Sequence, residues 1–284
     1  MKTSNPVLSR LGQAAERERA AGYGPAGQPA YGQQPGYGQP AYGQPAYGEP
    51  YPTATGYPAS PPAVQPMTID DVVVKTVTVL GITGISAAAA WALIPDALVG
   101  PAWIGAALVG LVLGLVISFS RMANPALVVT YAVIEGVFVG MISKFFETLY
   151  SGIVVQAVIA TFGVFFLMAI LYRARVIRAT KKFTRIMIAV MGGLFAVMLI
   201  NLVLALFGVN TGLRDSGPLG IIFSLVCIVV ASLSFILNFN EIEEGVRMGL
   251  PQRYSWTAAF GILVGLIWLY IEVLRLLSFL QGDD

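Results

Sequence analysis

The chain has 284 residues, of which 56% are hydrophobic and 11% are charged, and its mean hydropathy is +0.75. Soluble domains carry about 25% charged residues, so this composition excludes an ordinary soluble domain. The net charge of +2 is too small to indicate nucleic-acid binding, and no basic patch is interleaved with exposed aromatic residues. The absence of histidine excludes Ser-His catalysis, histidine zinc sites and a histidine pH switch.

Residues 1–70 differ in composition from the rest of the chain. Tyr-Gly-Gln repeats begin at Tyr31, Tyr37 and Tyr42, and a Tyr-Gly-Glu follows at Tyr47. Closely spaced Pro and Gly prevent regular helix and sheet, and the segment has too few apolar residues for a core. We expect a disordered cytoplasmic tail here. A segment that binds partners or associates with itself is the alternative reading.

Residues 71–284 form a series of apolar runs, separated by Pro, Gly, Asn and charged residues. A helix needs about 20 residues to cross the hydrocarbon of a bilayer, and only helices satisfy the backbone there within one segment. We therefore predict an all-α polytopic membrane protein with a bundle of seven transmembrane helices. The predicted spans are 72–94, 101–120, 125–146, 153–172, 186–207, 218–240 and 256–280.

Basic residues indicate the orientation. The stretch from Arg173 to Arg185 holds six Lys and Arg residues and no acid. Basic loops stay on the cytoplasmic side. Because successive spans alternate in direction, we predict that the N-terminus is cytoplasmic and that the C-terminus lies on the outer side of the membrane. The same stretch can contact anionic lipid headgroups.

Two carboxylates lie within apolar spans, where a charge costs at least a few kcal/mol and usually marks an ion or substrate route. Glu135 lies about 15 Å into the third span and Glu272 lies in the second half of the seventh. Glu272 can form a salt bridge with Arg275 one turn later, and a neutral Glu135 can form a hydrogen bond across helices. Alternatively, the two acids bind a cation or a proton, with Asn238 and other amides as oxygen donors.

Asn240 and Glu241 complete the candidate ion site at the end of the sixth span. Glu241 begins an acidic group with Glu243 and Glu244. This group is either a solvated loop or a vestibule that attracts cations.

Glycines four residues apart recur in three spans, at 110 and 114, 136 and 140, and 261 and 265. Such pairs let helix backbones approach closely in lipid. Two of these pairs share a span with Glu135 or Glu272, so we expect both acids to face the bundle interior.

The residues that several enzyme classes require are absent from the sequence. No predicted span contains an aspartate, the seventh contains no lysine, and no phosphate-binding glycine loop of the Walker type occurs. We expect a protein that is not an enzyme and has no cofactor.

Four segments carry a family resemblance: 238–245 (NFNEIEEG), 256–277 (WTAAFGILVGLIWLYIEVLRLL), 131–136 (YAVIEG) and 4–7 (SNPV). They resemble a bacterial branch of the Bax inhibitor-1/YccA-like family, over roughly residues 70–284 and the first few residues. The span-seven segment, with an acid three residues before Arg275, is the most specific of the four.

The resemblance implies a seven-helix bundle with its last helix near the centre, in a bacterial plasma membrane. It also implies a pH-sensitive calcium leak, with an ion site made by one acid of span six and one of span seven. These positions match Asn238 and Glu272, so these two residues are the calcium ligands that the resemblance implies. Asn238 departs from the family's acid, and the family's basic latch matches no residue securely, with Arg121 as the candidate.

The sequence thus predicts a Ca²⁺ or H⁺ leak in which protonation of Glu272 controls the flow and Glu135 is accessory. The resemblance also supports an alternative of another class, a protein that does not conduct ions. It would regulate a membrane protease or envelope machinery through protein contacts, with the tyrosine-rich tail as the binding arm.

Overall fold

The computed structural model describes residues 65–120, 122–209, 211–215 and 217–282, and Pro66 onward forms one compact unit. Seven of its helices are long and apolar enough to cross a membrane, which confirms the predicted fold class. The predicted tail, apart from its last residues, lies outside the described residues. The elements are α2 (Ile69–Leu93), the short 3₁₀ helix η1 (Asp96–Leu98), α3 (Val99–Phe119), α4 (Pro125–Leu149), α5 (Ile153–Arg173), α6 (Lys181–Leu206), α7 (Pro218–Arg247) and α8 (Tyr254–Gln281).

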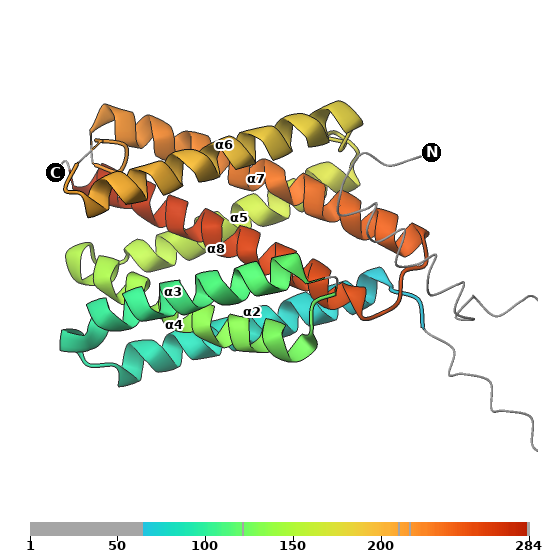
Figure 1. Ribbon diagram of the computed structural model, residues 1–284, viewed down its shortest axis with the longest axis horizontal. Coiled ribbons are helices and arrows are strands. Elements are labelled where there is room, and N and C mark those ends of the chain that lie inside the picture. The colour runs from blue at the N-terminus through green and yellow to red at the C-terminus, as the bar shows by residue number, and fades with distance from the viewer. Residues whose placement is uncertain (1–64, 121, 210, 216, 283–284) are drawn as a thin grey trace, which may run out of the picture. The chain divides into compact units, whose positions relative to one another are not determined.

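Helix α8 lies at the centre of the bundle. It packs against α2, α4, α5 and α7, and in Figure 1 it runs between the α2–α4 group and the α5–α7 group. Because it contacts four other helices, a larger share of its residues is buried than in any other span of the described chain. The central last helix that the resemblance implies is therefore confirmed.

Successive helices alternate in direction, so the bundle has two ends (Figure 1). We call the end where α5 leads into α6 the basic end, since it carries the basic residues from Arg173 to Arg185. The opposite end, where α8 finishes, we call the Gln281 end. Which end faces the cytoplasm is still a prediction.

At the basic end, α6 and α7 extend furthest beyond the predicted spans. α6 begins at Lys181, because the Thr180 side chain accepts a hydrogen bond from the backbone N–H of Phe183 and caps the helix. α7 continues to Arg247, so Glu241 and its acidic neighbours lie on a helix. The prediction of a loop for this acidic group was wrong, because the helix continues through Gly245 and the chain turns only at Gly249, whose φ of 65° glycine adopts readily.

The predicted glycine pairs lie at helix contacts. A Cβ atom on any of these glycines would come within 4 Å of a residue on another helix. On α3, Gly110 would meet Glu135 and Gly114 would meet Tyr131. On α4, Gly136 would meet Ser86 and Gly140 would meet Ala87, and on α8, Gly261 would meet Asn238 and Gly265 would meet Phe235. The closest approach joins α4 to α2. There the Ser86 hydroxyl also donates to the backbone carbonyl of Val133 at 2.7 Å. Close packing and hydrogen bonds to backbone carbonyls hold helices together where no hydrophobic effect acts between them.

The start of α2 is tied to the turn between α7 and α8. The Met67 N–H donates to the Leu250 carbonyl at 2.7 Å, and the Gln252 amide donates to the Asp71 carboxylate at 2.6 Å. The Lys75 ammonium donates to the Gln252 carbonyl at 3.2 Å. These bonds fix the first membrane helix to the start of the central one.

We predict that Gly140→Ala destabilises the bundle by about 1–3 kcal/mol, the usual cost of overpacking. The new Cβ would lie 2.5 Å from the backbone oxygen of Ala87, and backbone atoms cannot move aside as a side-chain tip can. Unfolding of the purified protein by detergent titration measures the change.

Gly163→Ala is the matched control, because a Cβ at that helical position meets nothing within 4 Å. It should leave the free energy of unfolding unchanged or raise it slightly. Equal effects of the two substitutions would contradict the packing account.

Candidate functional site

Glu272 lies in the protein interior near the Gln281 end of α8, with 1% of its surface exposed. The Arg275 guanidinium, one turn later, donates to its Oε2 atom at 2.8 Å. The predicted salt bridge is therefore present. It does not turn the acid outward, because Arg275 is itself largely buried, with 13% of its side chain exposed.

Two further elements reach Glu272. Arg214, on the connection between α6 and α7, places its Nη2 atom 4.0 Å from Oε1 of Glu272. The Ser224 hydroxyl of α7 lies 3.2 Å from the Glu272 backbone oxygen and 3.4 Å from its Oε2. The carboxylate is thus shared between two guanidinium groups and one hydroxyl, from three parts of the chain.

The cluster of Glu272, Arg275 and Arg214 has one more positive than negative charge. Partial burial lowers the pKa of Arg214, the nearby Arg275 lowers it further, and Glu272 raises it. Arginine remains protonated even so, because its ordinary pKa lies far above physiological pH. Glu272 is therefore what holds two mutually repelling cations together at this end of the bundle.

Glu135 is also buried, with 8% of its surface exposed, and it faces α3. A Cβ on Gly110 would lie 2.6 Å from its Oε1, so this glycine provides the room for the carboxylate. Tyr131, one turn earlier on α4, is its polar neighbour. The prediction that both acids face the interior is confirmed.

Glu135 and Glu272 lie far apart. Helices α4 and α8 run side by side, with Tyr131 in ring contact with Phe260 and Ser143 in contact with Tyr270. Glu135 is one turn beyond the first contact and Glu272 is three turns beyond it, so they differ by about 12 Å along the bundle axis. They cannot share one ion or one proton in this conformation, because sharing requires a separation of about 6 Å or less.

Asn238 is distant from Glu272 as well. Its side-chain amide donates to the Gly261 carbonyl at 3.3 Å, more than two helical turns from Glu272 and about 16 Å along α8. The ion-binding pair that the resemblance implies is therefore not assembled in this conformation. Asn240 and Glu241 follow Asn238 on α7 toward the basic end, Asn240 half-buried and Glu241 exposed, and Arg121 lies outside the described residues.

The surroundings of Glu272 do not fit a calcium ion in this conformation. Calcium takes six to eight oxygen ligands, whereas both Glu272 oxygens face guanidinium groups. Within the described parts of the chain, no group of three or more His, Cys, Asp or Glu side chains could hold a metal ion. A cation can approach Glu272 only after the arginines move.

Sequence reasoning missed Arg214 and Ser224 as partners of Glu272. A usable signal existed for Arg214, since the predicted topology places the connection after the fifth span at the same end as the close of the seventh. Ser224 carried no such signal, because one serine in an apolar helix does not reveal the direction it faces.

A hollow of about 730 Å³ adjoins the cluster between α3 and α6. Its polar wall consists of Asn201, Arg214 and Asp215, and the rest is apolar, with Leu111 on the α3 side. The Arg214 guanidinium thus stands between Glu272 and an open space.

Comparison with known proteins identifies one family. The sequence profile of the Bax inhibitor 1 like family matches residues 5–282, nearly the whole chain. A search of curated proteins found no match.

We predict that Glu272→Leu destabilises the protein by about 3–5 kcal/mol, the usual cost of leaving one member of a buried ion pair without its partner. Glu244→Gln is the control, since Glu244 pairs at 3.9 Å with Arg247, whose side chain is 79% exposed. That change should cost less than about 1 kcal/mol. Detergent unfolding compares the two, and a Glu272→Leu protein as stable as the parent would contradict the assigned role.

Proposed function

This chain belongs to the Bax inhibitor 1 like family of membrane proteins, and on that premise we propose that it is a cation leak, for Ca²⁺ or H⁺, whose closed state is held by Glu272. The observation that carries the proposal is the buried Glu272 carboxylate shared between Arg275 of α8 and Arg214 of the α6–α7 connection. A charge in a spanning segment usually marks a transport route. Here it also joins the central helix to a peripheral connection.

Protonation of Glu272 supplies the opening step. A neutral carboxylic acid no longer attracts either guanidinium, and Arg214 and Arg275 then repel each other across a poorly screened interior. Arg214 can move, because 38% of its side chain is already exposed beside the hollow between α3 and α6. Its departure frees the Glu272 oxygens for a passing cation.

Glu135 is the accessory acid along the same route. Leu111 lines the hollow, and its chain neighbour Gly110 packs against the Glu135 carboxylate. A path that enters beside Arg214 and follows α3 therefore leads to Glu135. Asn238, Asn240 and Glu241 stand near the basic end, where they offer oxygen atoms to a cation that leaves the bundle.

The membrane that this leak would cross is a bacterial plasma membrane, as the resemblance implies, and the predicted orientation gives the side on which each end lies. With the N-terminus cytoplasmic and the C-terminus outside, the Glu272 cluster lies near the outer face. The basic stretch from Arg173 to Arg185 then lies near cytoplasmic anionic lipids.

A second function is favoured by the position of α6. Among the described elements this helix packs only against α7, and it exposes apolar side chains such as Phe195 and Leu199. An uncovered helix face suits a membrane partner, as in the regulator of a protease or of envelope machinery. Deleting residues 1–66 tests a regulator that binds through the tail, which would lose its function, whereas a leak and a regulator that binds through α6 would keep theirs.

We predict that Glu272→Gln gives a leak with no pH dependence, because the amide mimics the protonated acid and cannot hold both arginines. In liposomes, the parent should leak faster at acidic than at alkaline pH. The variant should leak at the faster rate in both conditions. Ca²⁺-sensitive and pH-sensitive dyes inside the liposomes identify the ion.

The Glu244→Gln protein serves as the matched control and should keep the parent's pH response. The gating proposal fails if Glu272→Gln responds to pH as the parent does. The leak itself is excluded if no variant carries either ion while the protein remains folded.

A further inference from the structure

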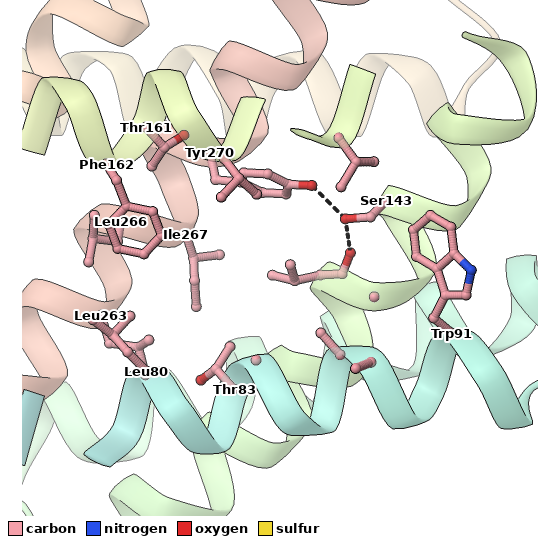
Figure 2. A pocket seen from close by; sticks show the side chains of 17 residues that line it. Leu80, Thr83, Trp91, Ser143, Thr161, Phe162, Leu263, Leu266, Ile267 and Tyr270 are labelled. Atoms are coloured by element: carbon pink, nitrogen blue, oxygen red, sulfur yellow. Dashed lines mark hydrogen bonds between the residues drawn. The ribbon is translucent and has the colours of Figure 1, made fainter. Parts of the chain in front are cut away.

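A second hollow lies on the opposite face of α8 from Glu272. It has a volume of about 540 Å³ and is lined by residues of α2, α4, α5 and α8 (Figure 2). Tyr270 lines it from α8, and a residue two positions further along a helix points about 200° away. The hollow is therefore separate from the Glu272 cluster, although it contacts the same part of the central helix.

The hollow opens toward the hydrocarbon of the bilayer. Among the described elements, α2 and α5 each pack on α8 and make no contact with one another, so a gap remains between them. Val158 and Phe162 of α5 line the hollow and are themselves exposed, at 40% and 39%, so its wall continues onto the lipid-facing surface. Of the residues that the structure describes, none that lines the hollow is charged. Its size suits one small, mainly apolar molecule that arrives through the membrane.

Thr161 gives the hollow a hydrogen-bond donor. Its side-chain oxygen is buried and has no hydrogen-bond partner among the described residues. The residue is 3% exposed and lines the hollow. A ligand with an acceptor oxygen would give this hydroxyl the hydrogen bond that it lacks. Figure 2 shows Thr161 on one wall and Tyr270 with Ser143 on another.

The other hydroxyls facing the hollow already use their protons. Ser143 donates to the Val139 carbonyl at 2.5 Å, and its oxygen lies 2.6 Å from the Tyr270 hydroxyl, which must therefore be the donor in that pair. Thr83 donates to the Val79 carbonyl at 2.9 Å. Thr161 is thus the hydroxyl that recognises an acceptor.

We propose that this hollow binds a neutral ring compound of the quinone type, whose carbonyl oxygen accepts a hydrogen bond from Thr161 and whose apolar tail leaves between α2 and α5. Thr161 lies eight residues into α5, about 12 Å from its start and thus in the middle third of the membrane. The ester carbonyls of phospholipids stay near the headgroups and do not reach this depth. A neutral quinone ring does, and its carbonyls are acceptors only. The proposal concerns binding and is independent of the leak.

The test is equilibrium binding of 2-methyl-3-decyl-1,4-naphthoquinone to the full-length protein in nanodiscs. The carbonyl-free 2-methyl-3-decylnaphthalene is the matched probe. Thr161→Val keeps the shape of the side chain and removes the hydroxyl. It should weaken quinone binding about threefold to tenfold and leave naphthalene binding unchanged.

Two controls separate this effect from a general loss of stability. Thr76→Val removes a second buried hydroxyl that has no hydrogen-bond partner in the described part of the chain. Thr76 does not line the hollow, so this change should leave quinone binding unchanged. Gly84→Phe places a ring in the hollow, whereas Gly81→Phe places a ring outside the hollow. At both positions the new Cβ meets no described atom within 4 Å, so the two substitutions are matched. Only Gly84→Phe should abolish binding of both probes.

Three results would overturn the proposal. The first is equal affinity of the parent for the two probes, which would mean that the hollow holds only an apolar chain. The second is a Thr161→Val protein that binds the quinone as tightly as the parent does. The third is a Gly84→Phe protein that does the same.

Discussion

A carboxylate inside a membrane-spanning helix needs its charge balanced by the protein, because lipid offers neither water nor counterions. In this protein the balance at Glu272 comes from Arg275 on the same helix and Arg214 on a distant connection. Helix α8 must therefore present its acid to the α6–α7 connection, and that connection must fold back over the end of the bundle. The position of the central helix and the closure of the Gln281 end both depend on this one interaction.

Small side chains make the remaining arrangement possible. Gly140 brings the backbone of α4 against Ala87 of α2, and Gly110 leaves space on α3 for the Glu135 carboxylate. In lipid, helices associate through close packing and short hydrogen bonds, because the surrounding hydrocarbon is as apolar as they are. The same glycines that build the bundle therefore also determine where a buried acid fits.

The two faces of α8 have different chemistry. One face carries Glu272 toward two arginines, and the other carries Tyr270 toward an apolar hollow with the Thr161 hydroxyl. A charged cluster responds to protons, whereas the hollow accepts neutral molecules from the membrane. Since both lie on the same turns of one helix, movement of α8 would alter both.

The fold class, the number of spans and the burial of both acids could be predicted from the sequence. They follow from local properties: an apolar run of some 20 residues must be a helix in lipid, and a charge in such a run must face inward. The three glycine pairs likewise predicted helix contacts, but they did not indicate which helices would meet.

The candidate site could be predicted only in part. Glu272 and Arg275 are one turn apart, so helix geometry alone brings them together. Arg214, Ser224 and the separation of Asn238 from Glu272 depend on the rotation and relative height of different helices. A sequence that is apolar on every side of its helices does not encode those two quantities locally, and only packing among all the helices decides them.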